Sequence, residues 1–510
     1  MHMNTQLLTE RYAPHIRGTI SCFDRVIVTG SLVDCCHSGA MQAQVVRRGL
    51  LFFDYAKVLA DPLRNRLHDN ARAIAEREGL KIDPIKKFGS FRKEDRIREI
   101  LSRRGTHPGL VHVFSAMEAC TCFKPWHDRG TGRTGLQTVS GRCAHYYFYF
   151  IDELFGLCYL RVPTWAPFTL QFYCNLHNWL AAKLGLADIA FEQQDNAFVR
   201  IADVAAAQKI ADAFDPNELH RRLEKWGRRF CPVLDEFPGG WHWSLCQVEY
   251  ATDIIFDRPL DLKALYETLT RTAIHEVKAD DIATFLGRNG LPADGDVDGG
   301  SRYNVLLEGT RIRHNLGKTA IKMYDKFGHV LRIETSTSEV GFFKHYRKVE
   351  HRDGTSAMKF APVKKTIHSL GALRELLAAS NRRYLEFISA FQDTSSGRTA
   401  LDQVSRTVRD AKDRPSRGIN FFRADDQELV LAVLRGEHTI SGLTARRLRR
   451  VLKGWKPAHL SRALRRLRAH GLLRKIGGTF KYYVTSLGRR VLLAAQNLRE
   501  TVLIPALVQE

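Results

Sequence analysis

Long apolar runs are missing from this 510-residue sequence, and its ten cysteines follow no ordered spacing. No segment approaches about 18 uninterrupted apolar residues, and the opening Met1-His-Met-Asn-Thr-Gln6 carries no basic stretch before an apolar one. A membrane span and a secretory signal are therefore not expected. Cys120-Thr-Cys122 has no second pair at zinc-ribbon distance, and the scattered thiols do not suggest a disulfide framework. We expect a soluble, reduced, cytoplasmic protein without a structural zinc ion.

Acidic residues are scarce relative to basic ones. The chain has 78 lysine and arginine residues against 55 aspartate and glutamate residues, which gives a formal net charge of +23. Much of the excess lies in predicted helices rather than in one tail, and this favours a polyanionic partner such as DNA or RNA. A basic face that is merely solvated is the alternative.

The length allows about three domains of ordinary size. Strand and helix patterns alternate at the start, which predicts an α/β domain over residues 1–135. Strands then dominate and predict an antiparallel-sheet α+β domain over 140–365, in which 169–184 is expected to be helical. Residues 366–418 are expected as helices and a polar linker, and 419–510 as a C-terminal domain. The predicted class is α+β.

The C-terminal segment combines one-sided charge with a recognisable order of elements. Between Gly436 and Arg490 the only acidic residue is Glu437. Helices are predicted over 425–434, 443–452 and 457–469, followed by strands on either side of Gly477-Gly478. This order resembles a winged helix-turn-helix, similar to MarR-like DNA-binding domains.

The resemblance implies that helix 457–469 reads DNA and that the following hairpin is the wing. The DNA-binding residues expected on this basis are Arg446, Arg447, Arg450, Lys456, His459, Arg462, Arg465, Arg466, Lys475 and Lys481. A winged helix that makes only protein contacts is the alternative.

Four short motifs contain the residue types of a phosphodiester-cleaving centre. They are Gln247-Val-Glu-Tyr-Ala-Thr-Asp253, Gly309-Thr-Arg311, Lys322-Met-Tyr-Asp-Lys326 and Leu331-Arg-Ile-Glu334. A tyrosine hydroxyl suits strand transfer because a phenolate is a far better leaving group than an alkoxide. Nearby cations favour its ionised form, and Lys322 and Lys326 flank Tyr324.

Over residues 244–336 these motifs resemble rolling-circle replication initiators of plasmids and filamentous phages. The resemblance implies that Tyr324 is the nucleophile, with Lys322, Lys326 and Arg311 as its catalytic partners. The chain departs from the familiar nicking pattern because it has no His-hydrophobic-His triplet.

A divalent metal would polarise the scissile phosphate, and Mg²⁺ or Mn²⁺ prefers oxygen ligands. Glu249 and Asp253 lie four residues apart on a predicted strand, so both point to one face and are the first predicted ligands. Asp325, Glu334 and His314 are further predicted ligands. The alternative is that these carboxylates form cross-strand ion pairs with Lys322, Arg332 or Arg311.

Three functions follow as hypotheses. The first is a replication initiator or mobile-element protein that binds duplex DNA, nicks a single strand and becomes covalently linked to it. The second is a non-catalytic transcriptional regulator. The third is an RNA-binding ribonucleoprotein component in which aromatic residues of 145–165 stack on bases. The sequence leaves the oligomeric state open.

Overall fold

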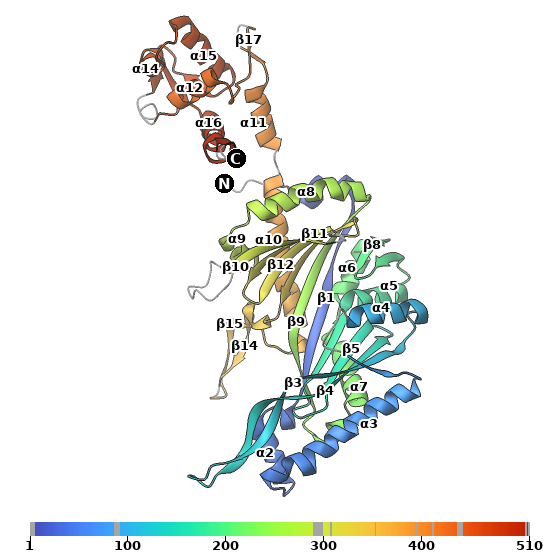
Figure 1. Cartoon of the computed structure of the whole chain (residues 1–510). Coiled ribbons are helices and arrows are strands. Elements are labelled where there is room, and N and C mark those ends of the chain that lie inside the picture. Colours follow the sequence, from blue (N-terminus) through green and yellow to red (C-terminus); the bar gives the residue numbers. More distant parts are fainter. Residues whose placement is uncertain are drawn as a thin grey trace. The chain divides into compact units, whose positions relative to one another are not determined.

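The computed structural model in Figure 1 describes residues 6–85, 92–288, 299–306, 309–351, 353–392, 395–410, 413–435, 442–504 and 507. The chain forms two compact units, Met1–Gln392 and Asp393–Glu510. Each unit has its own hydrophobic core, so each is described by itself.

The first unit is organised around one 11-stranded sheet with the order β10-β11-β12-β13-β9-β1-β6-β5-β4-β3-β2. Its strands are β1 (Ile16–Leu32), β2 (Ile82–Pro84), β3 (Gly109–His127), β4 (Thr134–Asp152), β5 (Gly156–Pro163), β6 (Leu170–Asn175), β9 (Trp241–Phe256), β10 (Gly299–Leu306), β11 (Gly309–Leu316), β12 (Thr319–Lys326) and β13 (Val330–Thr337). β2 pairs with β3 in parallel, and the other described pairs of this sheet are antiparallel. The class is mixed α+β, with a large sheet.

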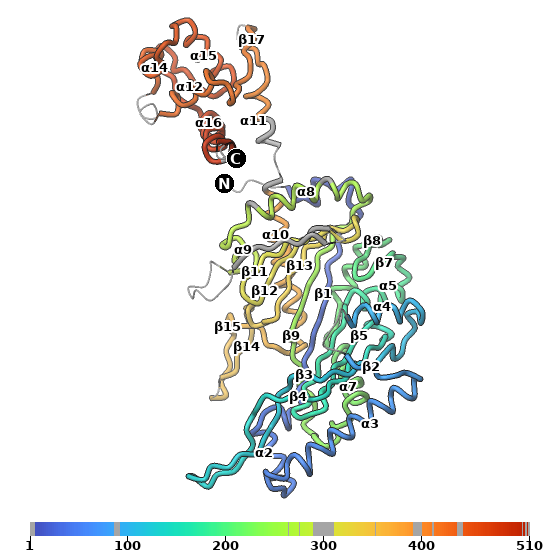
Figure 2. Tube along the Cα trace, viewed as in Figure 1, coloured from blue at the N-terminus to red at the C-terminus, as the bar shows by residue number. Residues whose placement is uncertain are grey.

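The sheet crosses the expected division between residues 135 and 140. β3 and β4 pair from Gly109 opposite Ile151 to His127 opposite Thr134, and Figure 2 shows them running out together as one long ribbon. Leu67 from the N-terminal part and Phe148 from β4 belong to the same core. A continuous ladder and a shared core therefore join the segments that were expected to be separate domains.

Ten α-helices of the first unit lie among the described residues. They are α1 (Leu8–Arg11), α2 (Ser38–Arg47), α3 (Asp61–Arg77), α4 (Lys93–Arg104), α5 (Leu176–Leu186), α6 (Val204–Asp212), α7 (Pro216–Phe230), α8 (Pro259–His275), α9 (Ala279–Phe285) and α10 (Leu370–Gln392). Residues of α8 and α10 form a second core with Ile254, Met323 and Ile333 from β9, β12 and β13. Because side chains alternate along a strand, their neighbours Lys322 and Tyr324 point to the opposite face.

The prediction of a helix over 169–184 is wrong in its first half. Residues Leu170–Asn175 are β6, and the helix begins at Leu176. Leu170, Phe172 and Cys174 alternate with less buried residues, which is the two-residue period of a strand. Asn175 then starts α5 by accepting a hydrogen bond from the backbone N–H of His177.

The aromatic residues of 145–165 lie mostly inside the first unit. Tyr146, Phe148 and Phe150 belong to the main core, and Tyr147 and Tyr149 belong to a smaller one on the other face of β4. The base-stacking surface expected there for RNA is therefore not formed by these side chains.

Two hairpins of the first unit form separate two-stranded sheets outside the main sheet. β7 (Phe191–Gln194) pairs with β8 (Ala197–Ile201), and Asp195-Asn196 makes the turn between them. β14 (Lys344–Glu350) pairs with β15 (Ser356–Pro362) as a separate two-stranded ribbon (Figure 1).

The second unit contains helices α11 (Ser395–Ser405), α12 (Ala424–Val433), α14 (Ala445–Val451), α15 (Pro457–Ala469) and α16 (Ser486–Leu498). Its three-stranded sheet has the order β18-β20-β19, from β18 (Leu443–Thr444), β19 (Leu473–Lys475) and β20 (Lys481–Val484). Leu460, Leu464 and Leu467 form the buried stripe of α15, which leaves its basic residues on the outer side. Part of the expected linker is a small hairpin of β16 (Val408–Arg409) and β17 (Pro415–Ser416). Within the described residues of both units, no helix is long and apolar enough to cross a bilayer.

Candidate functional site

The polar face of β12, β13 and β9 gathers most of the residues predicted for catalysis. Lys322 lies opposite Glu334, and Tyr324 lies opposite Arg332. Arg332 in turn lies opposite Asp253, and Ser336 opposite Glu249. Directly opposed residues share a face of an antiparallel sheet, so Tyr324 and these charged side chains point the same way.

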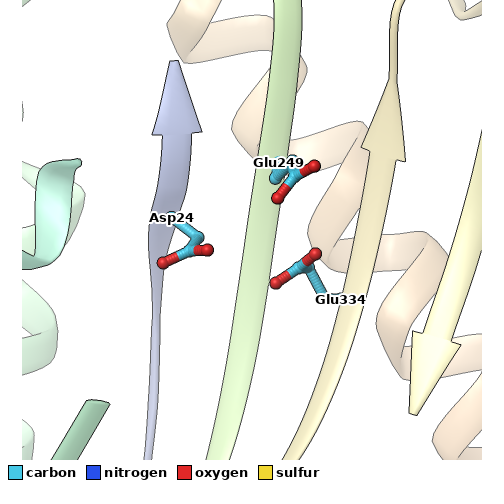
Figure 3. A group of neighbouring side chains, drawn as sticks. All are labelled: Asp24, Glu249 and Glu334. Atoms are coloured by element: carbon cyan, nitrogen blue, oxygen red, sulfur yellow. The ribbon is translucent and has the colours of Figure 1, made fainter. Parts of the chain in front are cut away.

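A bulge in β1 adds a carboxylate that the sequence reasoning missed. β1 pairs without a break with β9 from Gly18 opposite Ile255 to Phe23 opposite Tyr250, and pairing resumes with Val26 opposite Val248. Asp24 and Arg25 therefore both face Glu249, because a bulge places two residues against one. One oxygen each from Asp24, Glu249 and Glu334 lie within 4.8 Å of one another, and all three residues are buried (Figure 3).

Lys322 is the cation that faces two of these carboxylates. Its Nζ lies 2.6 Å from Glu334 Oε1 and 3.2 Å from Glu249 Oε1. Burial by itself would lower the pKa of Lys322, but the two carboxylates outweigh it and raise the pKa. The ion pairs weighed as the alternative to metal binding are thus present.

The Tyr324 hydroxyl donates a 2.5 Å hydrogen bond to Glu334 Oε2. Burial, followed by the Glu334 carboxylate, raises the pKa of Tyr324 well above its usual value. The lysines do not lower it as expected, because Lys322 points at the carboxylates and Lys326 donates to Asn196 Oδ1. Burial also raises the pKa of Glu334, although Lys322 opposes the rise. The hydroxyl therefore carries its proton and has a proton acceptor in contact.

Asp253 is paired with Arg332 and does not belong to the set of Asp24, Glu249 and Glu334, which we call the carboxylate group. Arg332 is fully buried, and its Nε and Nη2 each lie 2.6 Å from one oxygen of Asp253. Burial alone would raise the pKa of Asp253, but the guanidinium holds it below its usual value. Since both of its oxygens accept hydrogen bonds from Arg332, Asp253 does not fit the role of metal ligand predicted for it.

The same guanidinium connects Asp253 to the rest of the site. Arg332 donates to the Asn196 carbonyl at 2.5 Å and lies 3.1 Å from His177 Nε2 and 3.4 Å from Asp24 Oδ1. Asn196, from the turn between β7 and β8, also donates to Asp24 Oδ1 at 2.6 Å. The network fixes Asp24 from two sides.

Two predicted ligands lie on the wrong face of the sheet. His314 pairs with Ile321, and its Nε2 lies 3.1 Å from the Tyr384 hydroxyl of α10. Burial lowers the pKa of His314 to about 4. Asp325 accepts a 2.8 Å hydrogen bond from the Gly328 N–H and closes the turn between β12 and β13. The structure therefore brings neither side chain to Glu249 or Glu334.

Arg311 lies directly opposite Tyr324 on β11 and is half-buried, so it can reach a group that approaches the hydroxyl.

The sequence signal that could have identified Asp24 was a charged residue between Phe23 and Val26 in an apolar strand. A buried charge of this kind needs a partner, and here the partner comes from a distant part of the chain.

The carboxylate group fits a hard divalent cation by its chemistry. Asp24, Glu249 and Glu334 supply oxygen donors only, as Mg²⁺ and Mn²⁺ prefer. The Lys322 ammonium now neutralises two of them, so an ion and this ammonium would compete for the same oxygens.

The basic residues of the second unit lie mainly on its surface. Exposed side chains are Arg446, Arg447, Arg450, Lys456, His459, Arg462, Lys475 and Lys481, and half-buried ones are Arg465 and Arg466. A cavity of about 650 Å³ is lined by Lys456, His459, Arg462, Arg465 and Arg466 of this set and by Trp455, whose ring stacks on His459 at 4.2 Å. Arg466 pairs with the buried Asp426, which leaves it less available to a ligand than the exposed arginines.

Comparison with protein-family models gives no match, and comparison with curated proteins gives none either. Among solved structures, the chain is similar to a rolling circle replication initiator protein from Geobacillus stearothermophilus. The identity is 9% and the TM-score 0.18, over 63% of this chain and 74% of that one. A score this low carries no argument about function, which must come from the site.

Proposed function

We propose that this protein is a replication-initiator-like or mobile-element protein that cuts a DNA strand through Tyr324. The observation that carries this proposal is the 2.5 Å contact between the Tyr324 hydroxyl and Glu334, one of three buried carboxylates that share a face with it. A nucleophile, a proton acceptor and oxygen donors for a cation are thereby adjacent.

The chemistry follows from this contact. Tyr324 Oη attacks the phosphorus of a backbone phosphodiester, and its proton passes to Glu334 Oε2. A phosphotyrosine bond forms, the bond from phosphorus to one backbone oxygen breaks, and that oxygen takes a proton from water. The raised pKa of Glu334 makes it a better proton acceptor than an ordinary carboxylate.

The remaining groups of the face have supporting roles. Arg311, opposite Tyr324, would hold the phosphate by charge-assisted hydrogen bonds. Asp24, Glu249 and Glu334 would hold Mg²⁺ or Mn²⁺, which would polarise the phosphate. Arg332 keeps Asp24 and Asp253 ionised and in place.

A covalent adduct tests the proposal. The full chain is incubated with labelled single-stranded DNA and Mn²⁺, and the products are separated under denaturing conditions. We expect a labelled protein band that is lost in Tyr324→Phe. Tyr173→Phe is the matched control, because Tyr173 stacks on Tyr159 in the same sheet and lies outside the carboxylate group. An adduct that persists in Tyr324→Phe rules out this nucleophile.

We further propose that the second unit is a winged helix-turn-helix that binds duplex DNA. Its order of three helices and a β19–β20 hairpin supports this, and α15 would be the recognition helix. Lys475 and Lys481 would lie on the wing.

A second function is favoured by the ion pairs. Lys322 and Arg332 neutralise Glu249, Glu334 and Asp253 without any metal, which suits a non-catalytic DNA-binding regulator. Such a protein would bind duplex DNA with strong salt dependence and form no adduct with Mg²⁺ or Mn²⁺.

A further inference from the structure

Every side chain on one face of the β14–β15 hairpin is exposed. Tyr346 lies directly opposite Phe360, and Lys348 lies directly opposite Met358. Lys344, opposite Pro362, and Glu350, opposite Ser356, lie on the same side because alternate residues of a strand point the same way. We call the basic and large apolar side chains of this side, Lys344, Tyr346, Lys348, Met358 and Phe360, the hairpin face.

The hairpin face contains large apolar side chains that water surrounds. The exposed fraction is 66% for Tyr346, 70% for Phe360 and 53% for Met358. The alternate residues His345, Arg347 and Val349 are only half exposed, so the aromatic rings lie on the more open side. An apolar patch of this kind marks a binding surface more often than a scattered exposed residue does.

Charge selects the partner. From Lys344 to Pro362 the sequence has five lysine or arginine residues against two acidic ones, and Lys364-Lys365 follows. A positively charged ribbon attracts a polyanion, and the aromatic rings of Tyr346 and Phe360 beside the lysines offer flat stacking surfaces. Single-stranded DNA has both a negative backbone and unpaired bases, whereas duplex bases are already stacked.

We propose that the hairpin face binds single-stranded DNA, with bases stacked on Tyr346 and Phe360 and phosphates near Lys344 and Lys348. This goes beyond the proposed function, because it needs no cleavage at Tyr324. It assigns to the first unit a binding site for single-stranded DNA that is separate from the duplex-binding role proposed for the second unit.

Fluorescence anisotropy with a labelled 20-residue oligothymidine tests this on the full chain. Every variant carries Tyr324→Phe, so that adduct formation does not enter. Stacking on one aromatic ring corresponds to roughly a 5- to 150-fold change in dissociation constant, and we expect Tyr346→Ala and Phe360→Ala each to weaken binding within that range. Phe360→Tyr keeps a flat ring and should bind like the parent.

The controls separate stacking from other causes. Phe53→Ala removes an aromatic residue of the same unit that is 62% exposed, and should leave oligothymidine affinity unchanged. Duplex affinity should also be unchanged in Tyr346→Ala. The proposal is overturned if the double variant Tyr346→Ala/Phe360→Ala binds oligothymidine as well as the parent, or if it loses duplex and single-strand binding equally. It is also overturned if the parent sediments as a dimer that this double variant abolishes, since a second copy would then cover the face.

Discussion

Replacing Lys322 by methionine distinguishes a metal site from a set of structural ion pairs. Lys322 is buried, and its ammonium contacts Glu249 and Glu334 at 3.2 and 2.6 Å. Methionine fills most of the same volume but leaves the two carboxylates facing each other and Asp24 without that cation. Removing one partner of a buried pair costs about 3–5 kcal/mol, and we expect a loss of this size in the free energy of unfolding when the buffer contains EDTA.

A divalent cation should then restore stability. An ion that binds only the folded state adds about 2.7 kcal/mol at a concentration 100 times its dissociation constant. In Lys322→Met the ion no longer competes with an ammonium, so Mn²⁺ should stabilise this variant more than the parent. Six of the seven tryptophans, all except Trp455, lie in the first unit, so thermal unfolding followed by tryptophan fluorescence reports mainly on that unit.

Two variants control this result. Lys326→Met removes a neighbouring lysine that contacts Asn196 and should show no gain from Mn²⁺. Lys322→Met/Glu334→Gln keeps the methionine but removes one ligand, and should lose most of the gain. If Mn²⁺ stabilises Lys322→Met no more than it stabilises Lys326→Met, the carboxylates are structural and the metal role is refuted.

Three further predictions concern stability and DNA affinity. Arg332→Met should lower the free energy of unfolding by about 3–5 kcal/mol, and adding Asp253→Asn should recover part of the loss because one unpaired buried charge disappears, as urea unfolding would show. The pKa of His314 is lowered from 6.5 to about 4, so its contribution is present above pH 6.5 and is lost as the pH falls toward 4. His314→Gln should remove about 3 kcal/mol of that acid sensitivity, and equal acid sensitivity in parent and variant would contradict it. In the second unit, Arg462→Ala or Lys475→Ala should weaken duplex binding and reduce the slope of log affinity against log salt by about 1 each, with an unchanged slope counting against a phosphate contact.

The strands around Tyr324 could be predicted because their sequence is locally consistent. Alternating residues in Lys322-Met-Tyr-Asp-Lys326, with a short turn at Phe327-Gly-His329, indicate a hairpin, and β12 and β13 form it. The same alternation places Glu249 and Asp253 on one face of β9. Local periodicity was enough for these features.

The orientation of His314 could be predicted from the sequence, but the residue was wrongly predicted to be a metal ligand. The two-residue turn Gly317-Lys318 fixes the β11–β12 register, so His314 must lie opposite Ile321. A residue opposite an apolar partner on the helix-covered face points away from Tyr324. The register of β11 and β12 therefore excludes His314 as a ligand beside Tyr324.

Asp24 could not be found by the same route. Its approach to Glu249 depends on β1 lying beside β9, more than 200 residues later in the chain, and on the bulge between Phe23 and Val26. Likewise, the pairing of Asp253 with Arg332 rather than with a metal depends on burial and on the turn between β7 and β8, whose Asn196 carbonyl accepts a hydrogen bond from Arg332. Contacts between distant segments decide which carboxylates are available.

The bulge in β1 also makes the site sensitive to the number of residues in this strand. From Gly18 to the bulge, even-numbered residues of β1 share a side with Asp253, and directly after the bulge odd-numbered residues do, since Ile20 opposes Asp253 and Ile27 opposes Gln247. Deleting Arg25 would remove this bulge and force either Asp24 or the whole run from Val26 to Leu32 to change sides. Substituting Arg25 leaves that parity intact. In relatives of this chain that retain Asp24, Glu249 and Glu334, we therefore expect substitutions at this point of the strand but no insertions or deletions.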